Sequence, residues 1–282
     1  MERFNIKHII MHMRKICSLI AVAFLLVVSG CGGNKPGSSN DPKPTKSVRL
    51  MTYNVGAFGK YSENSTDMVA TMIKELKADI VGLQELDSCN TRHNWHQVKS
   101  LAEAVGNWNY TFTAAMDYKG GSYGVGIISK EKLGKEFDLH IPKGEGGEPR
   151  ACSIVETPDF VYATTHLDHI SDESRIAGAK IIDDFLWNRY KDSDKPVFLC
   201  GDMNSTPKGA TIAFFYTHFR NLADGCPATY PSTGAKKCID YIFCLRNKAS
   251  VTVTGFDVPV KYNKADASVA SDHLPVIVDV KF

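Results

Sequence analysis

The sequence lacks several features that would assign it to a common class of protein. It has no Cys-x-x-Cys pair, which argues against a structural zinc site, and no internal repeat of fixed period. The whole chain carries a formal net charge of only +2, and residues 31–282 contain 29 Lys and Arg against 30 Asp and Glu. This balance gives no sign of nucleic-acid binding, although a local basic groove would still be compatible with it.

No apolar run of the chain spans a bilayer comfortably. The longest, residues 16–28, follows Arg14 and Lys15 and ends at a small-residue segment before Cys31, an order typical of a signal peptide. Val28-Ser29-Gly30-Cys31 resembles a bacterial lipobox, which implies lipidation of Cys31. We therefore expect a signal peptide at residues 1–30, a Gly/Ser/Pro-rich flexible tether at 31–46, and a protein anchored by lipid in the bacterial cell envelope.

The remaining residues, 47–282, are numerous enough for one large domain with a sizeable core. Six of the eight cysteines lie beyond Cys31, and an exported chain could oxidise them. Cys226 and Cys238 flank a polar loop and are the best candidates for a disulfide. Cys152, Cys200 and Cys244 lie in apolar segments, so we expect them to be buried thiols.

Hydrophobic periodicity predicts alternating strands and helices over the whole domain. The predicted helices are 67–77, 95–104, 174–190 and 211–219. The predicted strands are 48–55, 80–86, 110–115, 123–129, 137–141, 151–156, 160–165, 197–200, 239–245, 251–258 and 274–280. Short strands separated by glycine-rich turns favour antiparallel pairing, and the two similar halves favour one sheet packed on another with helices outside.

Polar and acidic residues lie where these buried strands end. The segments are Thr52-Tyr53-Asn54, Leu83-Gln84-Glu85, Thr165-His166-Leu167-Asp168, Gly201-Asp202-Met203-Asn204, Ile239-Asp240-Tyr241 and Ser271-Asp272-His273. A charged group beside an apolar run is costly unless a metal, a partner or a substrate compensates. Six such positions therefore predict one metal-dependent hydrolytic site built from strand ends.

Each segment suits a step of phosphoryl chemistry. Asp202 can activate water while Asn204, two residues on and on the same side of the strand, donates to a phosphoryl oxygen. Asp240 can hold the imidazole of His273 in one tautomer. Glu85, together with Asn54, offers the hard oxygen ligands that Mg²⁺ or Mn²⁺ accepts.

In this order the six segments resemble the endonuclease/exonuclease/phosphatase superfamily of divalent-metal phosphoesterases, over residues 49–282. The resemblance implies an α/β fold, a four-layer sandwich of two packed, mixed and largely antiparallel β-sheets with helices on the outer faces. It also implies Mg²⁺ or Mn²⁺ as cofactor. In the metal shell it places Asn54, Glu85 and Asp272, with Glu85 as the principal ligand.

The same resemblance implies the remaining roles. His166 would contact the scissile phosphate and Asp202 would activate water. Asn204 would bind phosphate, and His273, oriented by Asp240, would stabilise the pentacovalent phosphorus. Arg150, which opens a strand, matches a position where the family often has an arginine near the site.

Two other functions compete with this interpretation. Residues 164–169 approach the H-x-H-x-D-H pattern of metallo-β-lactamase-type zinc hydrolases, but Thr164 replaces the first histidine, and His169 is then expected to be an ordinary surface residue. A non-catalytic binding lipoprotein would show substitutions at metal or phosphate positions, and none is seen.

The substrate is the least determined feature. We expect a monomer acting on a small or lipid-derived phosphodiester, with an extracellular nuclease as the rival function and nucleic acid a possible but less favoured partner. Three segments are candidates for substrate contacts: the glycine-rich 118–126, the polar 87–96, and residues 229–232 with Lys236 and Lys237. For the polar segment an ordinary exposed loop is an equal alternative.

Overall fold

The computed structural model describes residues 45–145 and 147–282. The predicted signal peptide, Cys31 and nearly all of the predicted tether lie outside these residues, so export and lipid attachment stay predictions. In the part of the chain that is described, no helix combines the length and the apolar character needed to cross a membrane.

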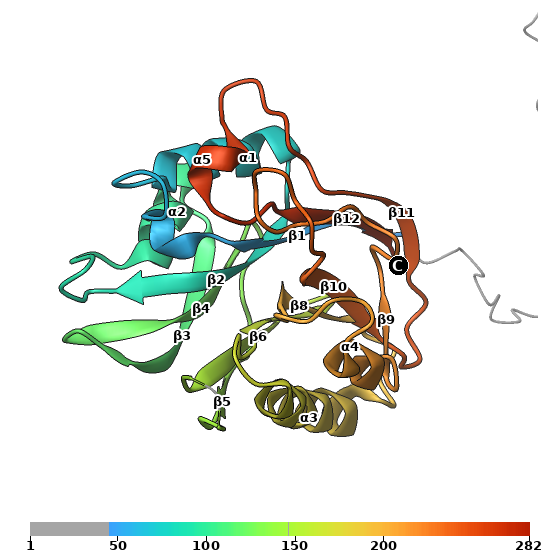
Figure 1. Cartoon of the computed structure of the whole chain (residues 1–282). Helices are drawn as coiled ribbons and strands as arrows, with labels where there is room; N and C mark the ends of the chain where they lie inside the picture. The colour runs from blue at the N-terminus through green and yellow to red at the C-terminus, as the bar shows by residue number, and fades with distance from the viewer. Residues whose placement is uncertain (1–44, 146) are drawn as a thin grey trace, which may run out of the picture. The chain divides into compact units, whose positions relative to one another are not determined.

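Two six-stranded sheets form the centre of the domain (Figure 1). The first has the order β11 (Thr252–Asp257), β12 (Val276–Lys281), β1 (Ser47–Asn54), β2 (Ile80–Ser88), β4 (Gly121–Ser129), β3 (Asn109–Tyr118). The second has the order β5 (Glu136–Ile141), β6 (Arg150–Glu156), β7 (Val161–His166), β8 (Val197–Asp202), β10 (Asp240–Leu245), β9 (Phe219–Asn221). In each sheet the central pair, β1/β2 or β7/β8, is parallel and the other pairs are antiparallel.

Helices cover the outer faces of both sheets (Figure 1). Helices α1 (Thr66–Leu76), α2 (Gln97–Gly106) and the short α5 (Ala267–Ala270) cover the first sheet, and a 3₁₀ turn, η2 (Gly56–Phe58), follows β1. Helices α3 (Asp172–Tyr190) and α4 (Ala210–Phe215) cover the second sheet. Burial of the apolar faces of α3 and α4 against β7, β8 and β10 builds a separate core cluster there. The predicted four-layer sandwich is confirmed.

The inner faces of the two sheets are in direct contact. Tyr162 Oη donates to the carbonyl of Met51 at 2.7 Å, and Gln84 Nε2 donates to Thr164 Oγ1 at 2.8 Å, both across the sheets. Gly82 is required by this close approach, since a Cβ there would overlap Cys200 Sγ and come within 2.7 Å of Thr164 Oγ1. These contacts fix the position of one sheet on the other.

Most predicted elements are present within two or three residues of their predicted bounds. One prediction was wrong: residues 211–219 do not form a single helix, because α4 ends at Phe215 and Phe219 opens the edge strand β9. Backbone pairing of Phe219–Asn221 with β10 overrides the local helical pattern. Strand β12 starts at Val276, directly after Pro275, because proline has no backbone N–H to donate to a β-ladder.

The topology brings the predicted site residues to one edge. Strands β1, β2, β7 and β8 all run toward this edge. Asn54, His166 and Asp202 are the last residues of β1, β7 and β8, and Glu85 lies at an irregularity of β2 three residues before its end. Strands β6, β10 and β12 are antiparallel to their neighbours and begin at the same edge. Arg150 and Asp240, which open β6 and β10, and His273, which precedes β12, therefore lie at the same edge as the strand-end residues.

Candidate active site

A carboxylate–imidazole pair lies at the junction of the two sheets. His273, in the loop before β12, places Nδ1 2.9 Å from Oδ2 of Asp240, the first residue of β10. Both side chains are buried. Burial acts to lower the pKa of His273, but the adjacent carboxylate of Asp240 outweighs it and raises this pKa to about 10. His273 is therefore an imidazolium at neutral pH.

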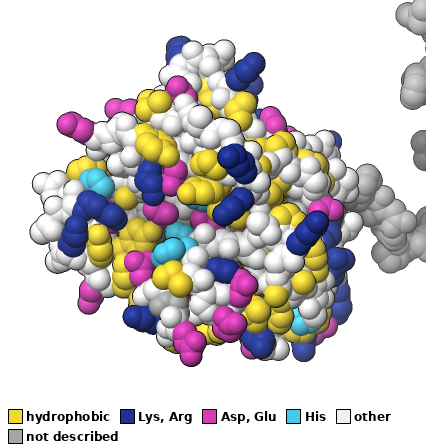
Figure 2. All heavy atoms as spheres, viewed as in Figure 1, with side chains coloured by type: hydrophobic (Ala, Val, Ile, Leu, Met, Phe, Trp, Pro, Cys, Tyr) yellow, Lys and Arg dark blue, Asp and Glu magenta, His cyan; other side chains and the backbone are white. Residues whose placement is uncertain are grey.

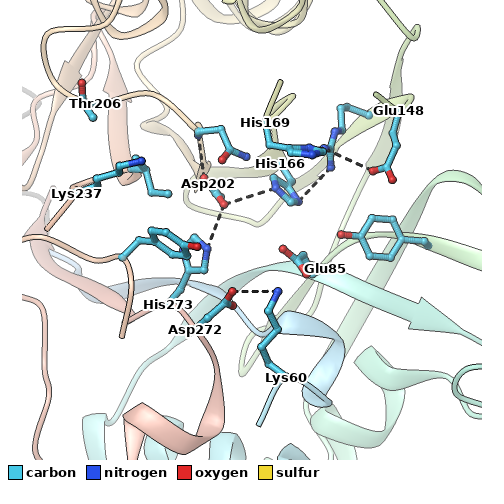
Figure 3. Close-up of a pocket in the computed structure, with 15 residues that line it drawn as sticks. Lys60, Glu85, Glu148, His166, His169, Asp202, Thr206, Lys237, Asp272 and His273 are labelled. Atoms are coloured by element: carbon cyan, nitrogen blue, oxygen red, sulfur yellow. Dashed lines mark hydrogen bonds and ion pairs between the residues drawn. The ribbon is translucent and has the colours of Figure 1, made fainter. Parts of the chain in front are cut away.

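Asp202, at the end of β8, lies at the centre of the site (Figure 3). Its Oδ2 is 3.5 Å from Nε2 of both His166 and His273 and accepts from Asn54 Nδ2 at 3.1 Å, while Oδ1 accepts from the backbone N–H of Asn204 at 2.8 Å. Burial, together with the charge of Asp240, raises the pKa of Asp202 to about 7. A carboxylate with that pKa can accept a proton from water near neutral pH.

Arg150 fixes the tautomers of two histidines. Its Nη1 is 3.3 Å from Nδ1 of His166, and its Nη2 is 3.1 Å from Nδ1 of His169. A guanidinium has donors only, so each Nδ1 must accept and each ring carries its proton on Nε2. Burial and the charge of Arg150 also lower the pKa of His166 well below its ordinary value. His166 is therefore a neutral ring with its Nε2–H directed toward Asp202 (Figure 3).

Glu85 reaches the site through a break in the regular strand geometry. The pairing of β2 with β4 shifts register between Leu83 and Leu86, and Glu85 has φ of 57° in the left-handed region. Such a conformation costs a non-glycine residue about 1–3 kcal/mol and is typical of functional sites. The bulge releases Glu85 from strict alternation, and its Oε1 accepts from Asn54 Nδ2 at 3.0 Å.

Asn54 connects the two sheets at the floor of the site. Its Oδ1 accepts from the backbone N–H of Gly56 at 3.1 Å, which directs Nδ2 toward the carboxylates of Glu85 and Asp202. The amide thus holds the two carboxyl groups near one another. In this orientation Asn54 directs its amide donor at the two carboxylates, and its role as a metal ligand stays a prediction.

A pocket of about 510 Å³ opens over this group, where histidine, acidic and basic side chains gather near the middle of the face shown in Figure 2. Seven of the nine predicted site residues line it: Glu85, Arg150, His166, Asp202, Asn204, Asp272 and His273. The other two, Asn54 and Asp240, do not line it but are hydrogen-bonded to residues that do. No residue of the polar segment 87–96 lines it. The segment is not an ordinary exposed loop either, because Asp87 is buried in β2, where it forms a salt bridge with Arg92, and Asn90 is buried as well.

Sequence reasoning missed four residues of the pocket wall, which are Lys60, Glu148, His169 and Thr206. His169 is exposed, as expected, but it lies on the pocket and contacts Arg150, so treating it as an ordinary surface residue was wrong. Its position after the strand that ends in His166 was the only available signal. Tyr123, Tyr230 and Lys237, from segments named as substrate candidates, also line the pocket.

The sequence profile of the Endonuclease/Exonuclease/phosphatase family matches residues 51–273. The chain belongs to this family. Its members are metal-dependent phosphoesterases, so the domain is a phosphoesterase-type hydrolase. The zinc-hydrolase alternative is thereby wrong, and Asp168 instead accepts backbone N–H groups from Gly147, Ile170 and Ser171.

Solved structures share the fold at low sequence identity. A family protein from Bacteroides thetaiotaomicron is 22% identical, with a TM-score of 0.69, over 84% of this chain and 96% of that one. A mannosyl-6-phosphatase from the same organism is 20% identical, with a TM-score of 0.69, over 83% of this chain and 100% of that one. The human Nocturnin catalytic domain is 20% identical, with a TM-score of 0.63, over 83% of this chain and 93% of that one. No curated protein matches the sequence.

The residues of the site fit the divalent metal that the family implies. Asp272 Oδ1 is buried and has no hydrogen-bond partner among the described residues, while Oδ2 is 3.0 Å from Lys60 Nζ. Together with Glu85 it offers carboxylate oxygens, the ligands that Mg²⁺ and Mn²⁺ prefer. A buried carboxylate oxygen that no protein donor reaches is expected where a cation would bind.

A second group could also hold a metal by spacing alone. Asp202, Asp240 and His273 each offer one atom, and these atoms lie within 4.8 Å of one another. The Nδ1 of His273 is, however, already hydrogen-bonded to Asp240. With this bond in place the three residues can act as an acid–base group, and Glu85 and Asp272 are the residues that would hold a metal.

Proposed function

We propose that this chain is a Mg²⁺- or Mn²⁺-dependent phosphoesterase that hydrolyses a small or lipid-derived phosphodiester by in-line attack of water. One observation supports it most: a carboxylate with a pKa near 7, an imidazolium and a neutral imidazole meet in one pocket beside the carboxylates of Glu85 and Asp272. These are the groups that water activation and phosphoryl charge stabilisation require.

The protein's own groups divide the reaction among them. Asp202 takes the proton from the attacking water, because its Oδ2 faces the space between the two histidines. His273, held cationic by Asp240, stabilises the charge that develops on the phosphoryl oxygens, and the Nε2–H of His166 donates to the same group. Asn204 uses one amide hydrogen to bond Leu167 and keeps the other for phosphate. A metal bound at Glu85 and Asp272 would act as a Lewis acid on a phosphate oxygen.

The pocket favours a small substrate. Its volume of about 510 Å³ is that of a site for a small molecule, and pockets of this kind enclose most of their ligand. Lys60, Arg150 and Lys237 add positive charge to its wall. A polymer would instead need an extended basic groove that follows its backbone.

A phosphomonoester is the second candidate substrate. The three cationic side chains on the wall suit a phosphate group that carries two negative charges. The similarity in fold to a mannosyl-6-phosphatase points the same way.

Hydrolysis of bis-p-nitrophenyl phosphate with Mg²⁺ or Mn²⁺ tests the proposal. Wild-type activity should disappear with EDTA and return with metal, Glu85→Ala should be inactive, and Glu103→Ala, which removes an exposed glutamate on α2, should match the wild type. Equal rates for Glu85→Ala and wild type would instead favour a non-catalytic binding protein. Parallel assays with p-nitrophenyl phosphate, sphingomyelin, phosphoinositide, RNA and plasmid separate the substrates, and rapid plasmid nicking alone would favour the nuclease.

We further propose that the protein is exported and anchored by lipid at Cys31, as the lipobox-like segment suggests. Labelled palmitate should be incorporated by the wild type and not by Cys31→Ser. A wild-type protein that takes up no label would refute the anchor.

A further inference from the structure

Two cysteines flank a hairpin that contributes to the pocket wall. Cys226 Sγ and Cys238 Sγ lie 3.5 Å apart as free thiols, and both residues are partly exposed. Between them residues 227–237 form a partly exposed hairpin, paired at its base by the N–H of Thr229 and the carbonyl of Lys237 at 2.8 Å. The sulfurs are thus close enough to bond after a small movement of either side chain.

The hairpin lies directly against catalytic groups. Tyr230 and Lys237 line the pocket, and the ring of Tyr230 is 4.9 Å from the ring of His273. The N–H of Ser232 donates to the carbonyl of Asp272 at 2.7 Å, and Leu274 donates to Thr229 at 2.8 Å. These bonds bracket the loop that holds Asp272 and His273, so the position of the hairpin and the position of this loop depend on each other.

We propose that Cys226 and Cys238 form a disulfide that fixes this hairpin and so positions Tyr230 and Lys237 to bind the substrate. The disulfide closes a loop in which only Thr229 and Ser232 are buried, so the cross-link would restrain the other, partly or fully exposed residues. Cys238 also lies two residues before Asp240, so the bond ties the hairpin to the start of β10. The positioning role rests on the proposed function, whereas formation of the bond does not.

The reaction needs a disulfide oxidant such as glutathione disulfide. The thiolate of Cys226 attacks one sulfur of the oxidant, forming a mixed disulfide and releasing one glutathione thiolate. The thiolate of Cys238 then attacks Cys226 Sγ and releases the second, so two protons and two electrons leave the protein. The hydrogen bond from Cys238 lowers the pKa of the Cys226 thiol, which favours Cys226 as the first nucleophile.

The other described cysteines provide the contrast. Cys152, Cys200 and Cys244 are buried thiols, as predicted, and burial raises the pKa of each. Cys89 is exposed and free. It therefore serves as the control for effects of oxidant that do not involve the hairpin.

Peptide mapping of the full chain after glutathione disulfide, with and without prior reduction, tests bond formation. We expect a Cys226–Cys238 cross-linked peptide in the oxidised protein, in wild type and Cys89→Ser alike. Free thiols at both positions under these conditions would overturn the proposal.

Two readouts test the positioning role. Reduction, or the double variant Cys226→Ser/Cys238→Ser, should speed amide hydrogen exchange in residues 227–237. It should also raise KM for bis-p-nitrophenyl phosphate about tenfold, with a smaller change in kcat, because the contacts that are lost bind the substrate. Cys89→Ser should show neither effect. A cross-link that changes neither exchange nor KM would overturn the role. If the oxidised wild type hydrolyses no phosphate ester, the proposed function is wrong. Peptide mapping and hydrogen exchange would still show whether the disulfide forms and whether it orders the hairpin.

Discussion

Replacing Asp240 by Asn removes the charge that keeps His273 protonated while leaving an oxygen that can still accept from its Nδ1–H. In the wild type, Asp202 should become ionised near pH 7 and His273 should lose its proton near pH 10. Activity should therefore follow a bell-shaped pH profile with a plateau between these values.

The size of the effect follows from these pKa values. Without the Asp240 carboxylate, the pKa of His273 should fall toward its ordinary value of 6.5, since burial is then opposed only by more distant charges. At pH 8 the protonated fraction would drop to about 3%, a loss of activity of roughly 30-fold or about 2 kcal/mol of barrier. The pKa of Asp202 should also fall, because the charge of Asp240 helps to raise it. The whole profile should therefore move to lower pH, with a smaller loss near pH 6.

Two measurements check this expectation, with a matched control. Histidine NMR titration of the metal-free protein should show the pKa of one imidazole falling by several units in Asp240→Asn, and kcat/KM should be measured from pH 5 to 10. Asp183→Asn removes another buried aspartate that pairs with a histidine, His218, at 2.9 Å on the second sheet's outer layer, and should keep the wild-type profile. An Asp240→Asn enzyme whose alkaline limb stays near pH 10 would refute the assigned role of the pair.

Three further outcomes are expected. Gly82→Ala should lower the free energy of unfolding by about 1–3 kcal/mol in urea titration, because the added Cβ would overlap Cys200 Sγ between the sheets. An unchanged urea midpoint would contradict this, since it would mean that the sheets can separate slightly to admit the methyl group. Arg150→Lys should reduce kcat/KM by about 10–100-fold, since one ammonium cannot bridge both histidines, and wild-type kinetics would contradict the tautomer argument. Asp87→Asn should cost about 2 kcal/mol of unfolding free energy at pH 7, from its paired bonds to Arg92. Although burial opposes it, this pairing lowers the pKa of Asp87, so its contribution is complete above about pH 3.8 and disappears as pH falls through the lowered pKa. Equal losses at pH 7 and pH 2 would contradict that assignment.

The order of strands and helices could be predicted because each element follows its own hydrophobic period. Residues 80–86, for example, are apolar enough to be read as a buried strand, and β2 is buried along most of its length. The end of the 211–219 segment could not be read in this way. Its conformation is set by pairing with β10, for example of Phe219 with Leu245, a long-range contact that local propensity does not encode.

The site was predictable where a polar residue ends a buried strand, as at Asp202 and His166. It was not predictable where position depends on distant packing. Lys60 comes from the segment after η2 and meets Asp272 only because β1 and β12 are neighbours. The bulge at Glu85 likewise follows from the register of β2 on β4, which has no local signature in the sequence.

The division of the site between the two sheets explains why its chemistry depends on tertiary structure. Asn54 and Glu85 belong to the first sheet, and Asp202 and Asp240 belong to the second. His273 precedes a strand of the first sheet but bonds to the second through Asp240. The charge of His273 at pH 7 to 10 therefore depends on the packing of the sheets, because a separated His273 would lose the carboxylate that raises its pKa. Inter-sheet contacts thus help to set the charge of a group to which we assign a role in the proposed reaction.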